Sequence, residues 1–144
     1  MKAQRQPFFR IIDANLNRAR EGIRVCEEVA RFVLSDPRLT RRCQRLRHDL
    51  GAAARQFASA QLVGNRDSRR DVGRPGVRKT AGIHGGYPAL VRANALRVQE
   101  AFRVLEEFTR LKSLRLSQLF GALRFRAYTL EQDILSKLPS VRHR

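Results

Sequence analysis

The stretch ANLNRAREGIRVCEEVARF at residues 14–32 returns later in the chain as ANALRVQEAFRVLEEFTRL at residues 93–111. At a constant offset of 79 residues, nine of the 19 positions are identical, which is far more than chance produces. In both copies apolar residues recur every three or four positions, the period of an amphipathic helix. The stretch therefore predicts two equivalent helices in a chain built by internal duplication.

The first copy lies in a helix that we expect to begin at Asp13, as its N-cap, and to end near Leu34. Its apolar stripe consists of Leu16, Ala19, Ile23, Cys26, Ala30 and Val33. Asp36 and Pro37 then have the residue types that start a new helix, as N-cap and first helical residue. Because the connection is so short, these two helices should form an antiparallel hairpin.

Helical periodicity disappears between about residues 61 and 87. This segment holds six of the nine glycines in the chain and the charged run NRDSRRDVG at residues 65–73. A loop of such length inside a compact domain is usually functional or disordered. We therefore expect a long Gly/Arg-rich crossover loop between the two halves.

Periodicity returns at Pro88, which should open a third helix, and again near Leu116 for a fourth. Strand patterns are almost absent. The sequence thus predicts an all-α fold, a four-helix bundle made of two tandem helical hairpins related by a pseudo-twofold axis. We assign residues 1–144 to a single domain, with repeat 1 at about 10–60 and repeat 2 at about 88–138.

The composition is that of a globular protein with 42% hydrophobic and 30% charged residues. No apolar run approaches the roughly 20 residues that span a bilayer, so no membrane partner is expected. The first residues, MKAQRQPFFRIID, lack the apolar core of a signal peptide. Two cysteines make no disulfide framework, and a cytoplasmic location is the simplest expectation.

Positive charge is the strongest compositional feature. The formal net charge is +17, and 26 of the 30 basic residues are arginine. Such a balance predicts polyanionic partners, among them nucleic acids and phosphorylated small molecules. Arginine offers phosphate a planar, bidentate fork, although many of these side chains could equally be solvated surface residues.

Polar residues occur in the repeat where a bundle helix needs none. At about 100° per residue, Asn15 falls inside the apolar stripe and Arg18 at its edge, and Asn94 and Arg97 repeat this pair. One interpretation is a central polar cavity near the pseudo-twofold axis, lined by both pairs. The other is structural, with amides that tie down backbone and arginines that form surface ion pairs.

Asp67 and Asp71 lie four residues apart in the expected crossover loop, among arginines and glycines. One or two carboxylates together with phosphate oxygens and water are typical ligands of Mg²⁺, and exposed glycine N–H groups bind anions. The same pattern also describes a solvated loop. The sequence contains no GxxxxGK[ST] loop, no GxGxxG turn after a strand and no His/Cys spacing typical of metal sites.

Four blocks of sequence resemble the small hydroxymethylpyrimidine phosphate kinase domain of thiamine biosynthesis, which is often fused ahead of thiamine phosphate synthase. The blocks keep the family order over about residues 10–135 and read DANLNRAREGIRVCEEVARFVL, RDSRRDVG, RANALRVQEAFRVLEE and LRFRAYTLE. The resemblance implies transfer of a phosphoryl group from ATP to hydroxymethylpyrimidine phosphate, which gives the diphosphate. We accordingly expect ATP as co-substrate and Mg²⁺ as cofactor.

Under this interpretation Arg66, Asp67 and Asp71 are the catalytic residues, and the two aspartates bind Mg²⁺. The expected substrate-binding residues are Asn15, Arg18, Asn94, Arg97, Arg47, Arg124 and Tyr128, the last three being weaker candidates. An acceptor that is itself a phosphate is already anionic near neutral pH, so the reaction needs no general base. Positioning and charge neutralisation by arginines and Mg²⁺ are what the protein must supply.

The chain departs from the family pattern at four places. Asn65 and Arg74 replace a small residue and a threonine around the loop motif, residues 83–87 lack an expected arginine and acidic residue, and Phe125 replaces a tyrosine. Two other functions stay open: a basic helical nucleic-acid-binding module, and an inactive relative that binds a phosphorylated ligand. Leftover apolar surface on a bundle of this size would also leave room for a homodimer.

Overall fold

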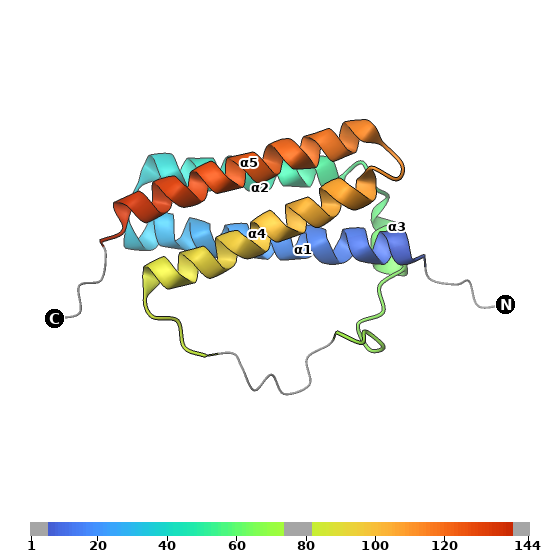
Figure 1. The fold of residues 1–144 in the computed structure, drawn as a ribbon, viewed down its shortest axis with the longest axis horizontal. Coiled ribbons are helices and arrows are strands. Elements are labelled where there is room, and N and C mark those ends of the chain that lie inside the picture. Colours follow the sequence, from blue (N-terminus) through green and yellow to red (C-terminus); the bar gives the residue numbers. More distant parts are fainter. Residues whose placement is uncertain (1–5, 74–81, 140–144) are drawn as a thin grey trace.

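The computed structural model describes residues 6–73 and 82–139 (Figure 1). The helices in these ranges are α1 (Pro7–Glu28) with the π-helical turn η1 (Val29–Val33), α2 (Pro37–Ala54), α3 (Ser59–Gly64), α4 (Tyr87–Thr109) and α5 (Leu114–Lys137). The described ranges contain no strand, so the expected all-α fold is confirmed.

The four long helices form two antiparallel hairpins, α1 with α2 and α4 with α5 (Figure 1). The hairpins join through α1–α4 and α2–α5 contacts, so each long helix packs against two others. The core is filled from all four helices by Ile12, Leu16, Ile23, Leu46, Leu50, Val91, Phe102, Leu105, Phe120 and Ile134. Across the described ranges, no helix has the length and hydrophobicity that crossing a bilayer requires.

Local sequence signals set most of the helix starts. The Oδ1 of Asp36 accepts a hydrogen bond from the Leu39 N–H at 3.0 Å and caps α2, as predicted. Pro88 lies in the first turn of α4, also as predicted. Ser113 caps α5 through the Leu116 N–H at 3.2 Å, so this helix begins two residues before the expected position.

The predicted start of the first helix is wrong. α1 begins at Pro7, with Gln6 as its N-cap, and Asp13 lies in the second turn with 8% of its surface exposed. Proline suits a first helical position because that position needs no N–H donor. Phe9 and Ile12 extend the apolar stripe toward the N-terminus and bury this added turn in the core.

The crossover is less irregular than expected, because Ser59–Gly64 form α3 and Leu62 joins the core. A helix of six residues is too short to display a periodic pattern in sequence. Residues 65–73 and 82–86 are irregular, as expected. Residues 74–81, which include Arg74, lie outside the described part of the chain.

The first helix ends near Leu34, as predicted, but its last turn is π-helical. In η1 the Leu34 N–H donates to the Val29 carbonyl at 3.0 Å, an i→i+5 bond that widens the turn. The wider turn rotates the following residues away from the stripe, so Val33 is 39% exposed although Ala30 is fully buried. Ser35 then adopts a φ of 48°, which closes the hairpin before α2.

Candidate functional site

A pocket of about 420 Å³ lies between the first turns of α1 and the segment that follows α3. It is lined by five of the ten residues that the sequence analysis assigned to the site, namely Asn15, Arg18, Arg66, Asp67 and Asp71. The two groups come from distant parts of the chain, the first repeat and the crossover. We call this pocket the α1 pocket.

Asp13 and Arg66 join the two walls of the α1 pocket. The Arg66 guanidinium donates from Nε to Asp13 Oδ2 and from Nη2 to Asp13 Oδ1, both at 2.7 Å. These hydrogen bonds, together with the charge of the carboxylate, raise the pKa of Arg66 above its ordinary value. The bidentate pair holds the start of the crossover against α1. The sequence analysis gave Asp13 only a capping role and did not predict that it would pair with Arg66.

Asn65 adds a second connection between the crossover and α1. Its Oδ1 accepts a hydrogen bond from the Gln6 backbone N–H at 2.7 Å, and its Nδ2 donates to the Gln61 carbonyl at 2.6 Å. The side chain therefore links the end of α3 to the residue that precedes α1. A small residue at position 65 could not make these bonds.

Asn15 positions Arg18 at the rim of the α1 pocket. The Asn15 side chain is buried, its Nδ2 donates to the Ile11 carbonyl at 2.9 Å, and its Oδ1 accepts from Arg18 Nη1 at 3.5 Å. The buried amide is thereby satisfied within its own helix. The guanidinium of Arg18 is held toward the pocket, where an anionic ligand could reach it.

The two crossover aspartates bond to nearby backbone. Asp71 Oδ1 accepts from the Gly73 N–H at 2.8 Å, and Asp67 Oδ1 accepts from the Arg70 N–H at 3.3 Å. Charges in the pocket lining balance, since three arginines face three aspartates: Arg10, Arg18 and Arg66, with Asp13, Asp67 and Asp71.

The aspartates of the α1 pocket raise the question of whether a metal ion could bind there. Within the described ranges, no three His, Cys, Asp or Glu side chains lie close enough together to hold a metal ion. Mg²⁺ needs no such group, because it commonly binds one or two carboxylates and completes its shell with phosphate oxygens and water. Asp67 and Asp71, which both line the α1 pocket, are the residues that could hold Mg²⁺ in this way.

Arg47 and Arg124, both expected at the substrate, instead bind buried or largely buried glutamates on the neighbouring helix of their own hairpin. Arg47 Nη2 lies 2.9 Å from Glu27 Oε1, and Arg124 Nε lies 3.0 Å from Glu106 Oε2. The two glutamates are equivalent in the repeat. Because both copies of the repeat carry a glutamate at this position, the sequence offered a signal that could have predicted these ion pairs. The sequence analysis did not use it.

Tyr128 lies beside Arg124 on α5 and outside the lining of the α1 pocket. Arg124 Nη1 donates to the Tyr128 hydroxyl at 3.4 Å, and its guanidinium lies 4.9 Å from the centre of the Phe125 ring. Hydrogen bonds to Tyr128 and to Glu106 raise the pKa of Arg124. Arg124, Phe125 and Tyr128 therefore form a cluster on α5 that is separate from the α1 pocket.

Asn94 and Arg97 lie on α4 and do not line the α1 pocket. Asn94 Nδ2 donates to the Leu90 carbonyl at 2.9 Å, which repeats the bond of Asn15. The Asn94 backbone meets α1 at Gly22, where an added Cβ would lie 2.9 Å from the Asn94 carbonyl oxygen. Gly22 is about 10 Å along the helix from Asn15 at 1.5 Å per residue, so each asparagine occupies its own environment.

Sequence comparisons identify the family. The model of the ThiD2 family matches residues 10–133. The chain belongs to the ThiD2 family. The match spans both hairpins and the crossover, and so includes every residue assigned to the site.

Two curated relatives carry the name thiamine-phosphate synthase. The protein from Synechocystis sp. PCC 6803 is 41% identical over 90% of this chain and 37% of its own length. The protein from Rhodopirellula baltica is 34% identical over 99% of this chain and 38% of its own length. The chain thus spans less than two fifths of the length of these two relatives. No solved structure matches it.

Proposed function

We propose that this ThiD2-family chain uses ATP and Mg²⁺ to phosphorylate hydroxymethylpyrimidine phosphate to the diphosphate, a reaction of thiamine biosynthesis. The family and the names of the relatives support the pathway. The observation that carries the reaction is the α1 pocket, where Asn15 and Arg18 lie beside Arg66, Asp67 and Asp71. The names of the relatives do not include a kinase, so the reaction rests on the pocket and on the resemblance.

The proposed chemistry requires little beyond positioning. An oxygen of the acceptor monophosphate attacks the γ-phosphorus of ATP and forms a new P–O bond. The bond between that phosphorus and the β–γ bridging oxygen breaks, and ADP leaves with the electron pair. Because the second pKa of a phosphate monoester is about 6, the attacking oxygen is already anionic at neutral pH. No residue has to remove a proton.

Five polar residues of the α1 pocket have a role in this proposed reaction. Asp67 and Asp71 would hold Mg²⁺, which when bound neutralises charge on the phosphate oxygens. Arg18, positioned by Asn15, binds an anionic phosphate group at the rim. Arg66 is engaged by Asp13, so it acts first as a positioning residue that sets the place of Asp67 beside α1.

An assay that couples ADP release to a colour change, run with ATP, Mg²⁺ and hydroxymethylpyrimidine phosphate, tests the proposal. Wild type should turn over, and Asp67→Asn and Asp71→Asn should each lower kcat at least about 100-fold, the loss expected when charge stabilisation at the transferred group is removed. Glu28→Gln removes a partly exposed carboxylate from α1 outside the pocket and should leave kcat within about twofold of wild type. Unchanged turnover in both aspartate variants would refute the metal assignment.

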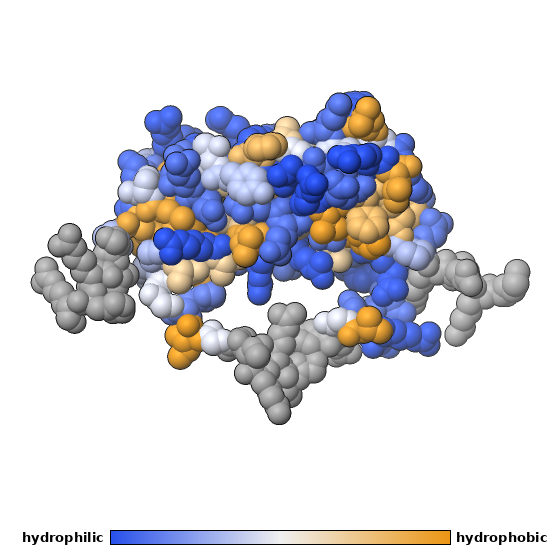
Figure 2. Space-filling model, in the orientation of Figure 1, coloured by the Kyte–Doolittle hydropathy of each residue, from blue (hydrophilic) through white to orange (hydrophobic). Residues whose placement is uncertain are grey.

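Two other outcomes would favour the alternative functions. Thermal stabilisation by the phosphorylated pyrimidine without ADP release would indicate an inactive ligand-binding relative. Tight binding of RNA or DNA with a steep salt dependence would favour a nucleic-acid-binding module. The charge of +17 and the hydrophilic residues that cover most of the face in Figure 2 are what keep this second alternative open.

A further inference from the structure

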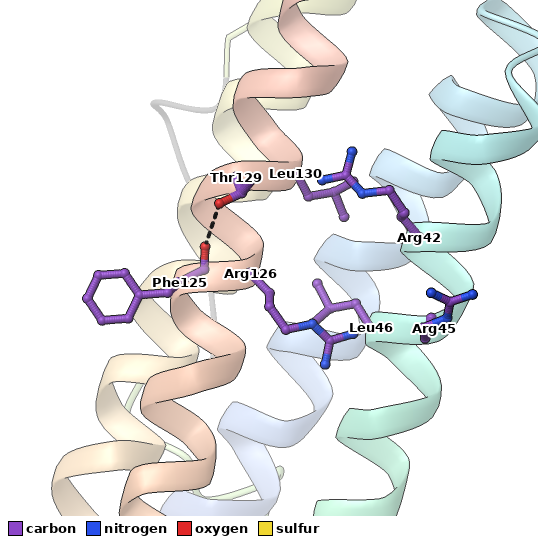
Figure 3. A pocket seen from close by; sticks show the side chains of 7 residues that line it. All are labelled: Arg42, Arg45, Leu46, Phe125, Arg126, Thr129 and Leu130. Atoms are coloured by element: carbon purple, nitrogen blue, oxygen red, sulfur yellow. Dashed lines mark hydrogen bonds between the residues drawn. The ribbon is translucent and has the colours of Figure 1, made fainter.

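A second pocket, of about 350 Å³, lies between α2 and α5 and is shown in Figure 3. Its polar lining includes Arg42 and Arg45 from α2 and Arg126 from α5, and Leu46 and Leu130 supply buried apolar lining. We call it the α2–α5 slot. It shares no lining residue with the α1 pocket.

Two ion pairs cross the gap between the helices in opposite directions. Arg42 of α2 donates from Nη1 to Asp133 Oδ2 of α5 at 2.7 Å. Arg126 of α5 donates from Nη1 to Asp49 Oδ2 of α2, also at 2.7 Å. Both guanidinium groups are thus held extended across the slot (Figure 3), so a ligand would find them already oriented.

Arg45 makes the slot cationic. It is exposed on α2, less than one turn from Arg42, and within the described ranges its side chain makes no hydrogen bond or ion pair. Including the carboxylates of Asp49 and Asp133, the cluster keeps an excess of one positive charge. The α1 pocket, with equal numbers of arginines and aspartates, has none. Buried leucines beside the arginines weaken solvent screening and strengthen the attraction of an anion.

We propose that the α2–α5 slot binds the diphosphate or triphosphate group of a small molecule without a metal ion. Guanidinium forks match pairs of phosphate oxygens, and the slot offers three of them within one cavity. The Phe125 ring points away from α2 (Figure 3), so recognition depends on the phosphate groups rather than on stacking. This site is independent of the proposed kinase reaction, which uses the α1 pocket.

A titration of the backbone amide NMR signals with inorganic pyrophosphate, in buffer with EDTA, tests this proposal. Saturable shifts should appear at residues 42–46 and 125–130. Arg45→Gln should raise the Kd about tenfold, the loss expected for one charge-assisted hydrogen bond. Arg41→Gln removes the same charge from an exposed neighbouring position that does not line the slot, and should change the Kd less than about twofold.

Equal weakening by Arg41→Gln and Arg45→Gln would overturn the proposal, because it would indicate general attraction to a +17 chain. Shifts that fail to saturate, or that spread over all arginine-bearing helices, would overturn it as well. Asp71→Asn should leave the pyrophosphate Kd of the slot unchanged. Absence of ADP release by the wild-type protein, together with an intact pyrophosphate Kd, would therefore count against the kinase proposal alone.

Discussion

At the scale of single residues, Glu27 is the most deeply buried charged side chain in the described ranges, with 1% of its surface exposed. Its Oε1 accepts hydrogen bonds from Arg47 Nε at 3.2 Å and Nη2 at 2.9 Å, and Arg24 lies 3.6 Å from Oε2. A buried carboxylate without such partners is costly. Arg47 therefore has a structural role that explains its presence without a substrate.

Removal of Arg47 should cost much more stability than removal of Arg24. Arg47→Met leaves the buried Glu27 with only the longer, 3.6 Å ion pair to the more exposed Arg24 and should lower the free energy of unfolding by about 3 kcal/mol. Arg24→Gln removes a more exposed arginine on the same glutamate and should cost about 0.5 kcal/mol or less. Urea unfolding followed by circular dichroism measures both. Similar stabilities for the two variants would show that the Arg47–Glu27 pair contributes little.

At the scale of the helices, the α1–α4 contact depends on small residues. A Cβ added to Gly22 would lie 2.6 Å from Val98 Cγ2 and 2.9 Å from the Asn94 carbonyl oxygen. The equivalent position in the second repeat is Ala101, which is also buried. Small side chains allow the two helix backbones to approach closely. The sequence analysis did not single out Gly22, because a glycine inside a helical pattern has no meaning until its neighbour is known.

Gly22→Ala should separate α1 from α4, because one of the atoms that the new methyl group meets is backbone and cannot turn away. We expect a loss of about 2 kcal/mol in the free energy of unfolding, despite the higher helix propensity of alanine. Gly51→Ala is the matched control, since its nearest neighbour lies at 3.8 Å, and should stabilise the protein by about 0.5–1 kcal/mol. Thermal and urea unfolding check both. A stable Gly22→Ala protein would contradict the close approach.

At the scale of the whole molecule, the two cysteines make stability sensitive to alkaline pH. Cys26 and Cys43 are both buried and unpaired, and burial raises the pKa of each thiol to about 12. The unfolded chain releases these protons near a pKa of about 8.5, whereas the folded chain keeps them. Their contribution to stability is therefore fully present below that value and is lost as pH rises toward 12.

The free energy of unfolding should accordingly fall between pH 9 and 11, by about 1 kcal/mol per pH unit for each thiol. A Cys26→Ala/Cys43→Ala variant should show a shallower decline, although the cavities that it creates lower its stability at all pH values. Urea titrations at several pH values measure the slope. Equal slopes in wild type and variant would place the pH dependence on other groups.

The duplicated helices, the hairpin connection and the capping role of Asp36 could be predicted from the sequence, because periodicity and capping are local properties of the chain. The α1 pocket could be predicted only in part. The motif at residues 66–71 was visible, but not that Asp13 would anchor it through Arg66. A carboxylate near a helix start looks like a cap until the true start is known.

By itself, the sequence determined an all-α bundle of two similar hairpins. Its apolar residues recur with the helical period, and the pattern of the first half returns in the second half. The tertiary structure decided which polar residues meet. It placed the first repeat beside the crossover in the α1 pocket, paired Arg47 and Arg124 with glutamates, and set Arg42 opposite Arg126. Such pairings depend on the order and spacing of helices in three dimensions, which a pattern along one helix does not encode.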